Sequence, residues 1–483
     1  MILKLKLLSL LIYFYYIDIC LPFKENFIWG VTSSSYSIEG GYLSNGKGMS
    51  NWDFYSNTFM EENGNISSDS YNKLGEDLLL IKNLNVTHYK FSISWSRILP
   101  QGDSINVNKK GLEYYDKLID GLININVEPI VTMVYYDIPL AIEDIGGWMN
   151  DKIQDYFYEY AILLFDRYND KVKYWITIED PYSMIMNGYG GEIIKWAPGN
   201  YEGLSNTSIY NGFYNVLKCH GKVGNLYKQK YNKGMIGISF TSFPTLPLTE
   251  FDINKSEIFF HLSFGLLGNP IFSESGNYPD EVLELFQQKT REEKRSSPRL
   301  RLFTIEEINE LRNSSDFIGI NYYGSSNKIS SLNHTDTIIW NDVERIYNQL
   351  ALEIDSIILR NKSNSDELDY WSGGLMYTLK YIKKNYLNIP ILITGNGIYE
   401  NSITAKIKYI KEHLEIINGG ILDNYNIIGY CVRSFLDGFE WSWGYSKKYG
   451  LYEVDFNSSN KKRKPREVAS YYKNVIKSNG LIL

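Results

Sequence analysis

Short runs of apolar and β-branched residues alternate along the chain with longer segments of helical spacing. The runs are Ile28–Thr32, His88–Ser92, Glu128–Met133, Lys173–Thr177, Met235–Ser239, Asp316–Asn321, Ile391–Thr394 and Ile427–Arg433. Each run has the length and composition of a buried strand. Between them, apolar residues recur every three or four positions, as at Leu112, Tyr115, Ile119 and Leu122. This spacing predicts amphipathic helices between the strands.

Eight strands that alternate with helices predict an α/β protein with a single (β/α)8 barrel over residues 21–483. No linker or charge block divides the chain. In such a barrel, side chains at the C-terminal ends of the strands and in the following loops carry the chemistry. Those positions hold Glu39, Lys90, Tyr135, Glu179, Asp180, Tyr323, Gly395, Glu440 and Trp441. Carboxylates and aromatic rings without imidazoles suit sugars, whose hydroxyls bond carboxylates and whose C–H faces pack on rings.

Residues 1–20 have the pattern of a secretion signal, with Lys4 and Lys6 before an apolar stretch and the small residue Cys20 at its end. The alternative is an N-terminal anchor, for which the stretch is short. We therefore expect a mature chain that spans no membrane and is secreted or held in the lumen of the secretory pathway. Eight N-x-Ser/Thr sequons agree with glycosylation on that route; they begin at Asn65, Asn85, Asn206, Asn254, Asn313, Asn333, Asn361 and Asn457.

The charge and the side-chain inventory exclude several classes of function. A net charge of −7 gives no broad basic field, so we expect no nucleic-acid partner. The five His residues are not spaced as metal ligands, and we expect no metal and no cofactor. After removal of Cys20, only Cys219 and Cys431 remain. One disulfide or two buried thiols are both open, and their apolar surroundings favour thiols.

Long motifs carry a resemblance to a known family. They read FIWGVTSSSYSIEGGY from Phe27, YKFSISWSRILP from Tyr89, EDIGGWMN from Glu143, SSDFIGINYY from Ser314 and SFLDGFEWSWGYSKKYGLYEVDF from Ser434. In these motifs the chain resembles glycoside hydrolase family 1, which includes β-glucosidases, lactase and the klotho proteins. The resemblance runs from Phe27 to Gly480. It implies a retaining mechanism, in which one carboxylate attacks the sugar and a second protonates the leaving oxygen.

Both catalytic positions implied by the resemblance have changed. The family has an acid/base in a T-F-N-E-P motif and a nucleophile in an I-T-E-N-G motif. This chain reads ITIEDP from Ile176, with Asp180 at the acid/base position, and ITGNG from Ile393, with Gly395 at the nucleophile position. Glycine cannot form a glycosyl ester. Asp180 is one methylene short, so it is either a poor proton donor or a polar wall residue.

The neighbouring positions have changed as well. Lys90 stands where the family has an arginine that forks onto the nucleophile, and lysine lacks that fork. A cation left in the barrel needs a counter-charge, so we expect Lys90 to pair with Glu179 or Asp180; Glu179 replaces a sugar-binding Asn. Relative to the family's substrate-binding set, Ser37 replaces Gln, Tyr135 and Tyr136 replace a His-Trp pair, and Arg433 replaces Trp, whereas Asn321, Tyr323, Glu440 and Trp441 are unchanged.

These departures favour a secreted, klotho-like pseudoenzyme that binds a glycan or protein ligand. Two alternatives remain open. One is an active β-glycosidase or transglycosidase with rerouted chemistry, in which Glu179 supplies a carboxylate. The other is a lectin-like carbohydrate binder that holds a sugar against Glu440 and Trp441. Tyr135 and Tyr136 are bulky enough to fill the sugar site. The shape of the cavity at the barrel mouth tests whether they do.

Overall fold

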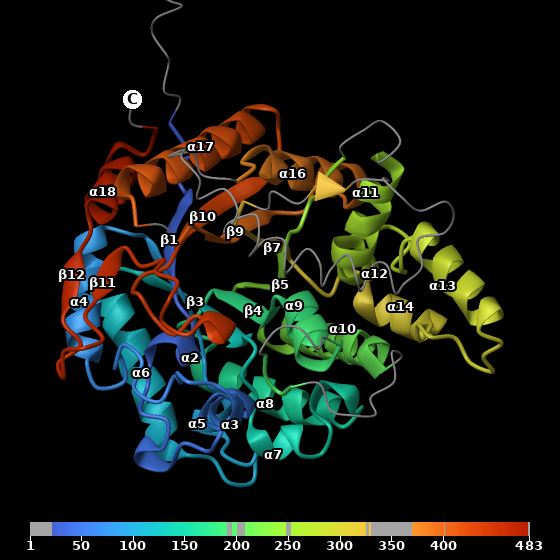
Figure 1. Ribbon diagram of the computed structural model, residues 1–483, viewed down its shortest axis with the longest axis horizontal. Coiled ribbons are helices and arrows are strands. Elements are labelled where there is room, and N and C mark those ends of the chain that lie inside the picture. Colours follow the sequence, from blue (N-terminus) through green and yellow to red (C-terminus); the bar gives the residue numbers. More distant parts are fainter. Residues whose placement is uncertain are drawn as a thin grey trace, which may run out of the picture.

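Eight parallel strands close into a barrel around which the helices are arranged (Figure 1). The structure is a computed structural model and describes residues 22–190, 196–199, 208–247, 253–324, 328–329, 370–399 and 401–481. The barrel strands are β1 (Ile28–Thr32), β2 (His88–Ser92), β3 (Glu128–Val134), β4 (Tyr174–Glu179), β5 (Met235–Thr241), β7 (Phe317–Tyr322), β9 (Ile391–Asn396) and β10 (Ile427–Arg433). The predicted (β/α)8 barrel is therefore confirmed.

Five strands extend past their predicted C-terminal ends. The runs predicted to end at Met133, Thr177, Ser239, Asn321 and Thr394 continue to Val134, Glu179, Thr241, Tyr322 and Asn396. These extensions follow from ladder pairing with neighbouring strands, as where Glu179 pairs with Ser239 and Asn321 pairs with Gly395. Glu179 and Gly395 are consequently strand residues and not loop residues. Glu179 is the last residue of β4, and Gly395 is the last but one of β9.

The helices lie outside the barrel and cover its apolar outer surface. The longer ones are α4 (Leu74–Leu84), α6 (Lys109–Asn124), α8 (Ile153–Tyr168), α10 (Ser208–Leu226), α13 (Asp280–Glu292), α16 (Gly373–Asn385), α17 (Ile403–Leu422) and α18 (Glu467–Ser478). The shorter ones are α2 (Ser35–Ile38), α3 (Asn51–Phe59), α5 (Trp95–Ile98), α7 (Leu140–Glu143), α9 (Pro181–Ile185), α11 (Ile253–Phe260), α12 (Leu266–Phe272) and α14 (Ile305–Leu311). Buried positions on α6 recur at helical spacing, as predicted: Leu112, Tyr115, Ile119 and Leu122.

Two small sheets and several single turns complete the fold. Strand β6 (Leu246–Pro247) pairs with β8 (Lys328–Ile329), and β11 (Tyr452–Val454) pairs with β12 (Arg463–Pro465). The turns η1 (Ser44–Gly46), η2 (Gly147–Met149) and η7 (Trp441–Trp443) are 3₁₀ helices. The turns η3 (Met186–Gly190), η4 (Tyr227–Tyr231) and η6 (His261–Gly265) are π-helical.

Both remaining cysteines are free and buried, as favoured from the sequence. The predicted signal at residues 1–20 and the sequons at Asn206, Asn333 and Asn361 lie outside the described residues. Over the part of the chain that is described, no helix combines the length and the apolar character needed to cross a membrane.

The floor of the barrel is a separate apolar cluster. It consists of Ile28, Ile130, Ile176, Phe317, Leu392 and Cys431, all buried. Cys431 faces Gly30 on the adjacent strand, and a methyl group added to Gly30 would meet its Sγ at 2.4 Å. The thiol thus fills the space that a larger residue at position 30 would need, and the two positions are coupled through packing.

We expect Gly30→Ala to lower the free energy of unfolding by about 1–3 kcal/mol, because it overpacks the barrel floor. In a Cys431→Ala background the same change should cost less, since the sulfur is gone. Urea unfolding of the two single variants and the double variant gives the coupling energy. A cost for Gly30→Ala that is equal in both backgrounds would contradict this account.

Candidate active site

A buried ion pair crosses the barrel interior. Lys90 of β2 donates from Nζ to both carboxylate oxygens of Glu179 of β4, each at 2.6 Å, and to Thr32 Oγ1 at 3.2 Å. The two charged side chains are 2% and 3% exposed. Lys90 is therefore paired with Glu179, one of the two carboxylates considered from the sequence, and not with Asp180.

Further hydrogen bonds occupy the remaining acceptor sites of Glu179. Asn321 of β7 donates from Nδ2 to Oε1 at 3.0 Å, and Thr132 of β3 donates to Oε2 at 3.3 Å. Thr394 of β9 in turn donates to Asn321 Oδ1 at 2.9 Å. This polar layer links strands β2, β3, β4, β7 and β9. A carboxylate that accepts this many bonds is held in place and is not free to attack a sugar carbon.

The space beside Gly395 is already filled. A Cβ atom built on Gly395 would lie 2.7 Å from Asn321 Oδ1 and 2.8 Å from the Tyr323 hydroxyl. Burial raises the Tyr323 pKa to about 12, while Arg433 acts to lower it, so this hydroxyl stays neutral. Two polar groups of β7 and the loop after it thus stand where the family's nucleophile side chain would begin.

Asp180 serves the start of helix α9. It adopts a left-handed backbone conformation (φ 49°), and its Oδ1 accepts from Ser183 N at 3.3 Å as the helix N-cap. Its Oδ2 accepts from the Tyr136 hydroxyl at 2.5 Å. Burial raises the pKa of Asp180, against the lowering effect of the Tyr136 bond. The carboxyl group is buried and fully engaged by its own protein, as expected of a polar wall residue.

Arg433 fills the centre of the barrel mouth. Its guanidinium pairs with Glu440 and donates from Nη1 to the Tyr135 hydroxyl at 3.1 Å and to the Tyr323 hydroxyl at 3.2 Å. It also lies over the Tyr449 ring, 5.0 Å from the centroid. Burial raises the Glu440 pKa to about 6, while Arg433 lowers it. Glu440 therefore has a protein partner at the position where the resemblance predicts sugar hydroxyls.

An aromatic cluster surrounds Trp441 and closes the side of the mouth. The Tyr136 and Tyr135 ring centroids lie 4.7 and 5.4 Å from that of Trp441. Tyr36 stacks on Trp441 at 5.7 Å, and Trp52 meets it edge-on at 4.8 Å. Trp441 is 2% exposed, so its ring offers no open platform for a sugar.

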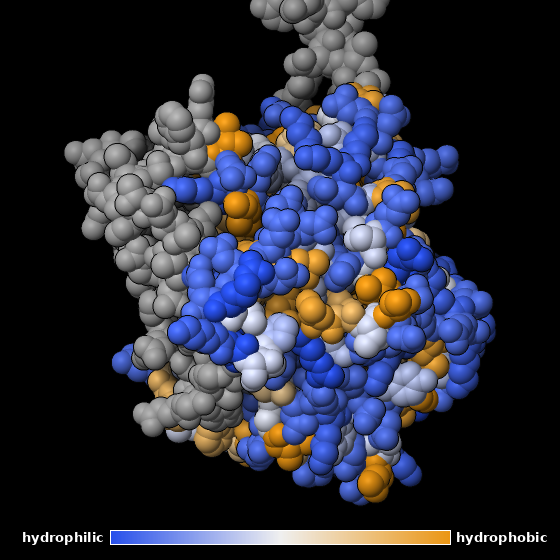
Figure 2. Space-filling model, turned by 90° about the vertical axis from the view of Figure 1, so that its right-hand side faces the viewer, coloured by the Kyte–Doolittle hydropathy of each residue, from blue (hydrophilic) through white to orange (hydrophobic). Residues whose placement is uncertain are grey.

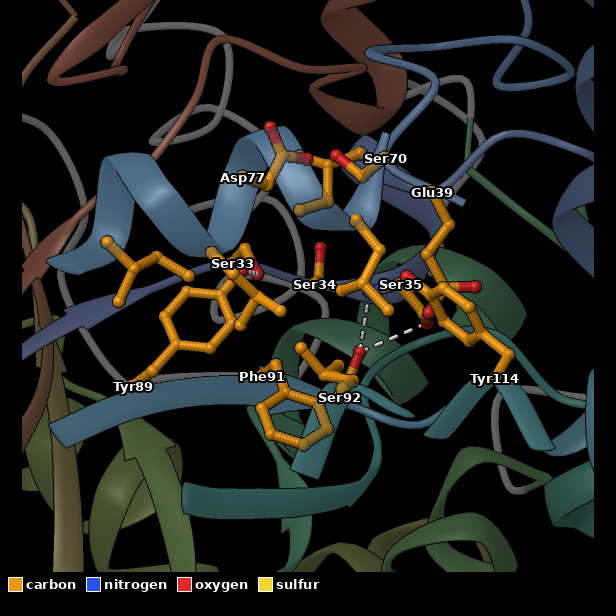
Figure 3. Close-up of a pocket in the computed structure, with 15 residues that line it drawn as sticks. Ser33, Ser34, Ser35, Glu39, Ser70, Asp77, Tyr89, Phe91, Ser92 and Tyr114 are labelled. Atoms are coloured by element: carbon orange, nitrogen blue, oxygen red, sulfur yellow. Dashed lines mark hydrogen bonds between the residues drawn. The ribbon is translucent and has the colours of Figure 1, made fainter. Parts of the chain in front are cut away.

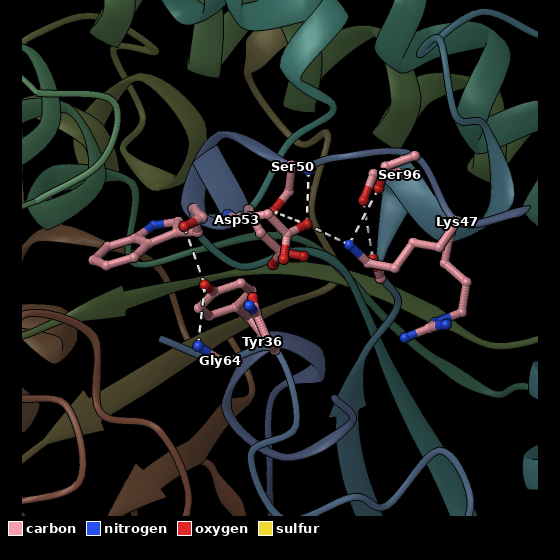
Figure 4. A network of polar contacts seen from close by, with 12 residues as sticks. Tyr36, Lys47, Ser50, Asp53, Gly64 and Ser96 are labelled. Atoms are coloured by element: carbon pink, nitrogen blue, oxygen red, sulfur yellow. Dashed lines mark hydrogen bonds and ion pairs between the residues drawn. The ribbon is translucent and has the colours of Figure 1, made fainter. Parts of the chain in front are cut away.

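Buried polar contacts fix this aromatic cluster from behind (Figure 4). The Tyr36 hydroxyl donates to the Trp52 carbonyl at 3.0 Å and accepts from Gly64 N at 3.4 Å. Trp52 lies in the first turn of α3, where Ser50 and Asp53 form a capping box and Asp53 pairs with Lys47. The helix end that carries Trp52 is thereby held rigidly against Tyr36.

Little space remains among these groups. The cavity bounded by Ser37, Tyr135, Glu179, Tyr323, Arg433 and Glu440 has a volume of about 20 Å3. A water molecule needs about 10–15 Å3 by the same measure, so this cavity has room for a water but not for a hexose. A second cavity of equal volume lies outside the barrel between Ser33–Ser35, β2 and α4, where Ser35 bonds Ser92 (Figure 3). Within the described residues, no three His, Cys, Asp or Glu side chains group as a metal site.

The sequence profile of glycosyl hydrolase family 1 matches residues 20–481. The chain belongs to glycosyl hydrolase family 1. Myrosinase 1 of Brevicoryne brassicae is 35% identical to it over 471 residues, covering 94% of this chain and 98% of the relative. The human cytosolic β-glucosidase is 33% identical, covering 95% and 99%. Human lactase/phlorizin hydrolase is 33% identical, covering 95% of this chain.

Solved family 1 structures have the same fold as this barrel. Aphid myrosinase superposes with a TM-score of 0.85 at 34% identity, covering 95% of this chain and 99% of that one. A β-glucosidase from Thermotoga maritima in complex with cyclophellitol gives 0.80 at 30% identity, covering 95% and 100%. The chain spans about a quarter of the length of the lactase/phlorizin hydrolases it matches (24%).

The family 1 resemblance located the positions around Gly395, but not all the residues that now fill the mouth. Thr132, Thr394 and Tyr449 were not singled out from the sequence. Thr132 and Thr394 each lie on a predicted strand, so inward alternation along these strands is the signal that indicates them. Tyr449 lies within the motif that begins at Ser434, and nothing in the sequence around it indicates that its ring contacts Arg433.

We expect Lys90→Met to lower the free energy of unfolding of this family 1 chain by about 3–5 kcal/mol, because it leaves Glu179 buried without its cation. The double variant Lys90→Met/Glu179→Gln should be more stable than the single one, since no charge remains unpaired. Urea unfolding measures both. As a control, Lys171→Met removes one member of an exposed pair with Asp120 and should change little. A double variant less stable than Lys90→Met would contradict the expectation.

Beside the mouth, Glu143 of α7 is a buried carboxyl group that forms no ion pair with a Lys or Arg side chain in the described part of the chain. It accepts from the Tyr189 hydroxyl at 2.7 Å and from Asn51 Nδ2 at 3.5 Å. Burial raises its pKa from 4.5 to about 7, although these hydrogen bonds lower it. The folded state therefore binds a proton here more tightly than the unfolded state does. This contribution to stability is complete below about pH 4.5 and is lost as the pH rises towards about 7.

Glu143→Gln should flatten the fall in stability between about pH 4.5 and 7, by up to about 3 kcal/mol over that window, because glutamine does not ionise. Urea unfolding at a series of pH values measures the slope. The matched control is Glu113→Gln on the exposed side of α6, which should leave the slope unchanged. An unchanged slope in Glu143→Gln would show that this carboxyl group does not titrate in the window.

Proposed function

We propose that this family 1 chain does not hydrolyse glycosides and acts instead as a ligand-binding pseudoenzyme. The observation that carries the proposal is Gly395 together with the occupied space beside it. A retaining glycosidase needs two carboxyl groups about 5–5.5 Å apart, one of which attacks the sugar. Loss of a catalytic nucleophile lowers kcat by about 10⁶-fold in other enzymes. No side chain at position 395 can take that role.

The nearby carboxyl groups do not replace the nucleophile. Glu179 is engaged by Lys90, Asn321 and Thr132, and Asp180 is engaged by Tyr136 and by the helix that it caps. Transfer of a proton or attack on a sugar would first require these bonds to break. A reaction rerouted through Glu179 is therefore disfavoured by its surroundings.

The binding surface of the proposed pseudoenzyme lies outside the barrel mouth. Arg433, Tyr135 and the cluster around Trp441 leave a cavity of about 20 Å3, which argues against a glycan held there. A protein ligand that lies across the outer loops is compatible with a filled mouth. The same reasoning disfavours a lectin-like site formed by Glu440 and Trp441, because both are buried and packed against protein groups.

The proposal places this protein outside the cell or in the secretory lumen. Residues 1–20 supply the pattern of a signal, and several sequons are available for modification. Among the described sequons, Asn85, Asn254, Asn313 and Asn457 are exposed. Oligosaccharides on these four residues would project into solvent without disturbing the core.

Purified protein should give no turnover of aryl β-glycosides above the blank, and no glycosyl azide when azide is added. Gly395→Glu should not restore activity, because its Cβ meets Asn321 and Tyr323 and because Lys90 and Asp180 remain changed. Release of the aryl group and the product mass measure this outcome. Sugars should also leave the Tm unchanged.

Turnover by the wild type that is abolished in Glu179→Gln would reject the proposal, because it would assign the activity to this site. The variant distinguishes such activity from a contaminating glycosidase, which the substitution would leave in place. A rise in Tm with a β-glycoside would instead favour the carbohydrate-binding alternative.

A further inference from the structure

The loop between α13 and α14 carries adjacent basic residues, Lys294 and Arg295, within its exposed part. All eight residues from 291 to 298 are exposed. Helix α13 lies at the right-hand margin of the molecule in Figure 1, far from the barrel axis, and that side of the surface is largely hydrophilic in Figure 2. Nothing in the described part of the chain covers this segment.

The backbone at this point is held by few hydrogen bonds. The amides of Glu293, Lys294 and Arg295 donate to the last turn of α13, at 3.0 to 3.1 Å, and Lys294 adopts a left-handed conformation (φ 50°). Residues 296–303 form no backbone–backbone hydrogen bond among the described residues. The last turn of a helix frays at small cost, so this segment can extend without unfolding of the barrel.

The side chains restrain Arg295 only weakly. Its Nη1 lies 3.8 Å from Glu293 Oε2, and both side chains are about one-third exposed (32% and 30%). A partly solvated pair at this distance contributes little. The loop is anchored further along, where Leu300 is buried and Arg301 pairs with Asp151 at 2.9 Å. Arg299 also donates from Nε to Glu293 Oε2 at 2.7 Å, so this ion pair spans the Arg295–Ser296 bond and must open before the segment extends. The exposed stretch runs from 291 to 298, on both sides of that bond.

The other adjacent basic residues of the chain are shielded in different ways. They are Lys109–Lys110, Lys383–Lys384, Lys447–Lys448 and Lys461–Lys464. The first two pairs lie at the start of α6 and in the last turn of α16, and each is followed after one residue by a buried side chain, Leu112 or Tyr386, which holds that helix end to the core. A protease binds its substrate as an extended strand, and these helices would have to unwind first.

The last two groups are tied to the body of the protein. The Lys448 carbonyl accepts from Lys406 Nζ at 2.6 Å, and Lys447 Nζ lies 3.6 Å from the Tyr399 ring centroid. In Lys461–Lys464, Arg463 pairs with Asp77 at 2.9 Å and belongs to β12. Among the basic pairs, Lys294–Arg295 is the one that is outside helices and strands with exposed residues on both sides.

We propose that the Arg295–Ser296 bond is a processing site for a serine endoprotease that recognises paired basic residues. Acidic pockets of such a protease would bind the Lys294 and Arg295 side chains. Water adds across the peptide bond, so that Arg295 gains a carboxylate and Ser296 becomes a free amine. Encounter with such a protease during secretion rests on the proposed function, whereas cleavage of the purified protein does not.

Cleavage would leave a two-chain protein instead of two separate pieces. The cut lies between β5 and β7, whose ladder runs from Gly237–Phe317 to Thr241–Asn321. On the other side of the barrel, β1 pairs with β10 from Ile28–Gly429 to Thr32–Arg433. Both ladders and the shared core hold the fragments together after the bond is broken.

The test is limited digestion of the folded full chain with a paired-basic-specific serine endoprotease of the kexin type. We expect one cut, with a new N-terminus that reads Ser296-Ser297-Pro298, and co-elution of both fragments on size exclusion under native conditions. Lys294→Gln/Arg295→Gln should slow this cut by about 10²-fold or more, because the acidic pockets are left without their charges. The matched control, Lys109→Gln/Lys110→Gln, should be cut at the wild-type rate.

Three results would overturn the proposal. They are a folded chain that resists the protease, a first cut at another basic pair, and cleavage at Arg295 that proceeds at the rate of global unfolding. Comparison of the cleavage rate with the unfolding rate in urea separates the last case from local opening. None of these outcomes depends on whether the protein hydrolyses glycosides, so the two proposals fail independently.

Discussion

A charge in the interior of a closed barrel must have a counter-charge, and the pair formed by Lys90 and Glu179 meets that requirement here. Isolated, either group would carry a desolvation penalty of several kcal/mol. Together, and with Asn321 and Thr132 bonded to the carboxylate, they form a polar layer above the apolar floor. In this layer the Glu179 carboxylate accepts hydrogen bonds from Lys90, Thr132 and Asn321, which hold it in place.

In the barrel mouth, a second buried cation is likewise surrounded by groups that bond to it. Arg433 introduces a cation, and Glu440, Tyr135 and Tyr323 turn towards it. Tyr136 extends to Asp180 and packs on Trp441. Glu440, Tyr135 and Tyr323, which would be free for sugar hydroxyls in an open site, bond to Arg433 instead. These mutual contacts explain how several buried polar side chains coexist with so small a cavity.

The sequence predicted the architecture more fully than the site. All eight strands were found, because each is a run of apolar residues that a barrel buries on both faces. The extension of β4 to Glu179 was missed, because the end of that strand is set by its ladder with β5. This extension also decides the partner of Lys90. Glu179 remains in the strand and points inward, whereas Asp180 turns into a left-handed conformation and caps α9. Packing of Tyr136 against Trp441 and Trp196 depends on tertiary contacts that no local pattern encodes.

The occupied space beside Gly395 limits which substitutions the chain can accept at that position. A carboxylate regained at that position alone would collide with Asn321 and Tyr323, and it would find a lysine where a guanidinium fork is needed. Such a chain would be less stable, since its neighbours would have to shift. Under the proposed function, a return to hydrolysis would therefore need a carboxylate at position 395 together with changes at Asn321, Tyr323 and Lys90. A single substitution at this position meets a cost in stability before any gain in activity.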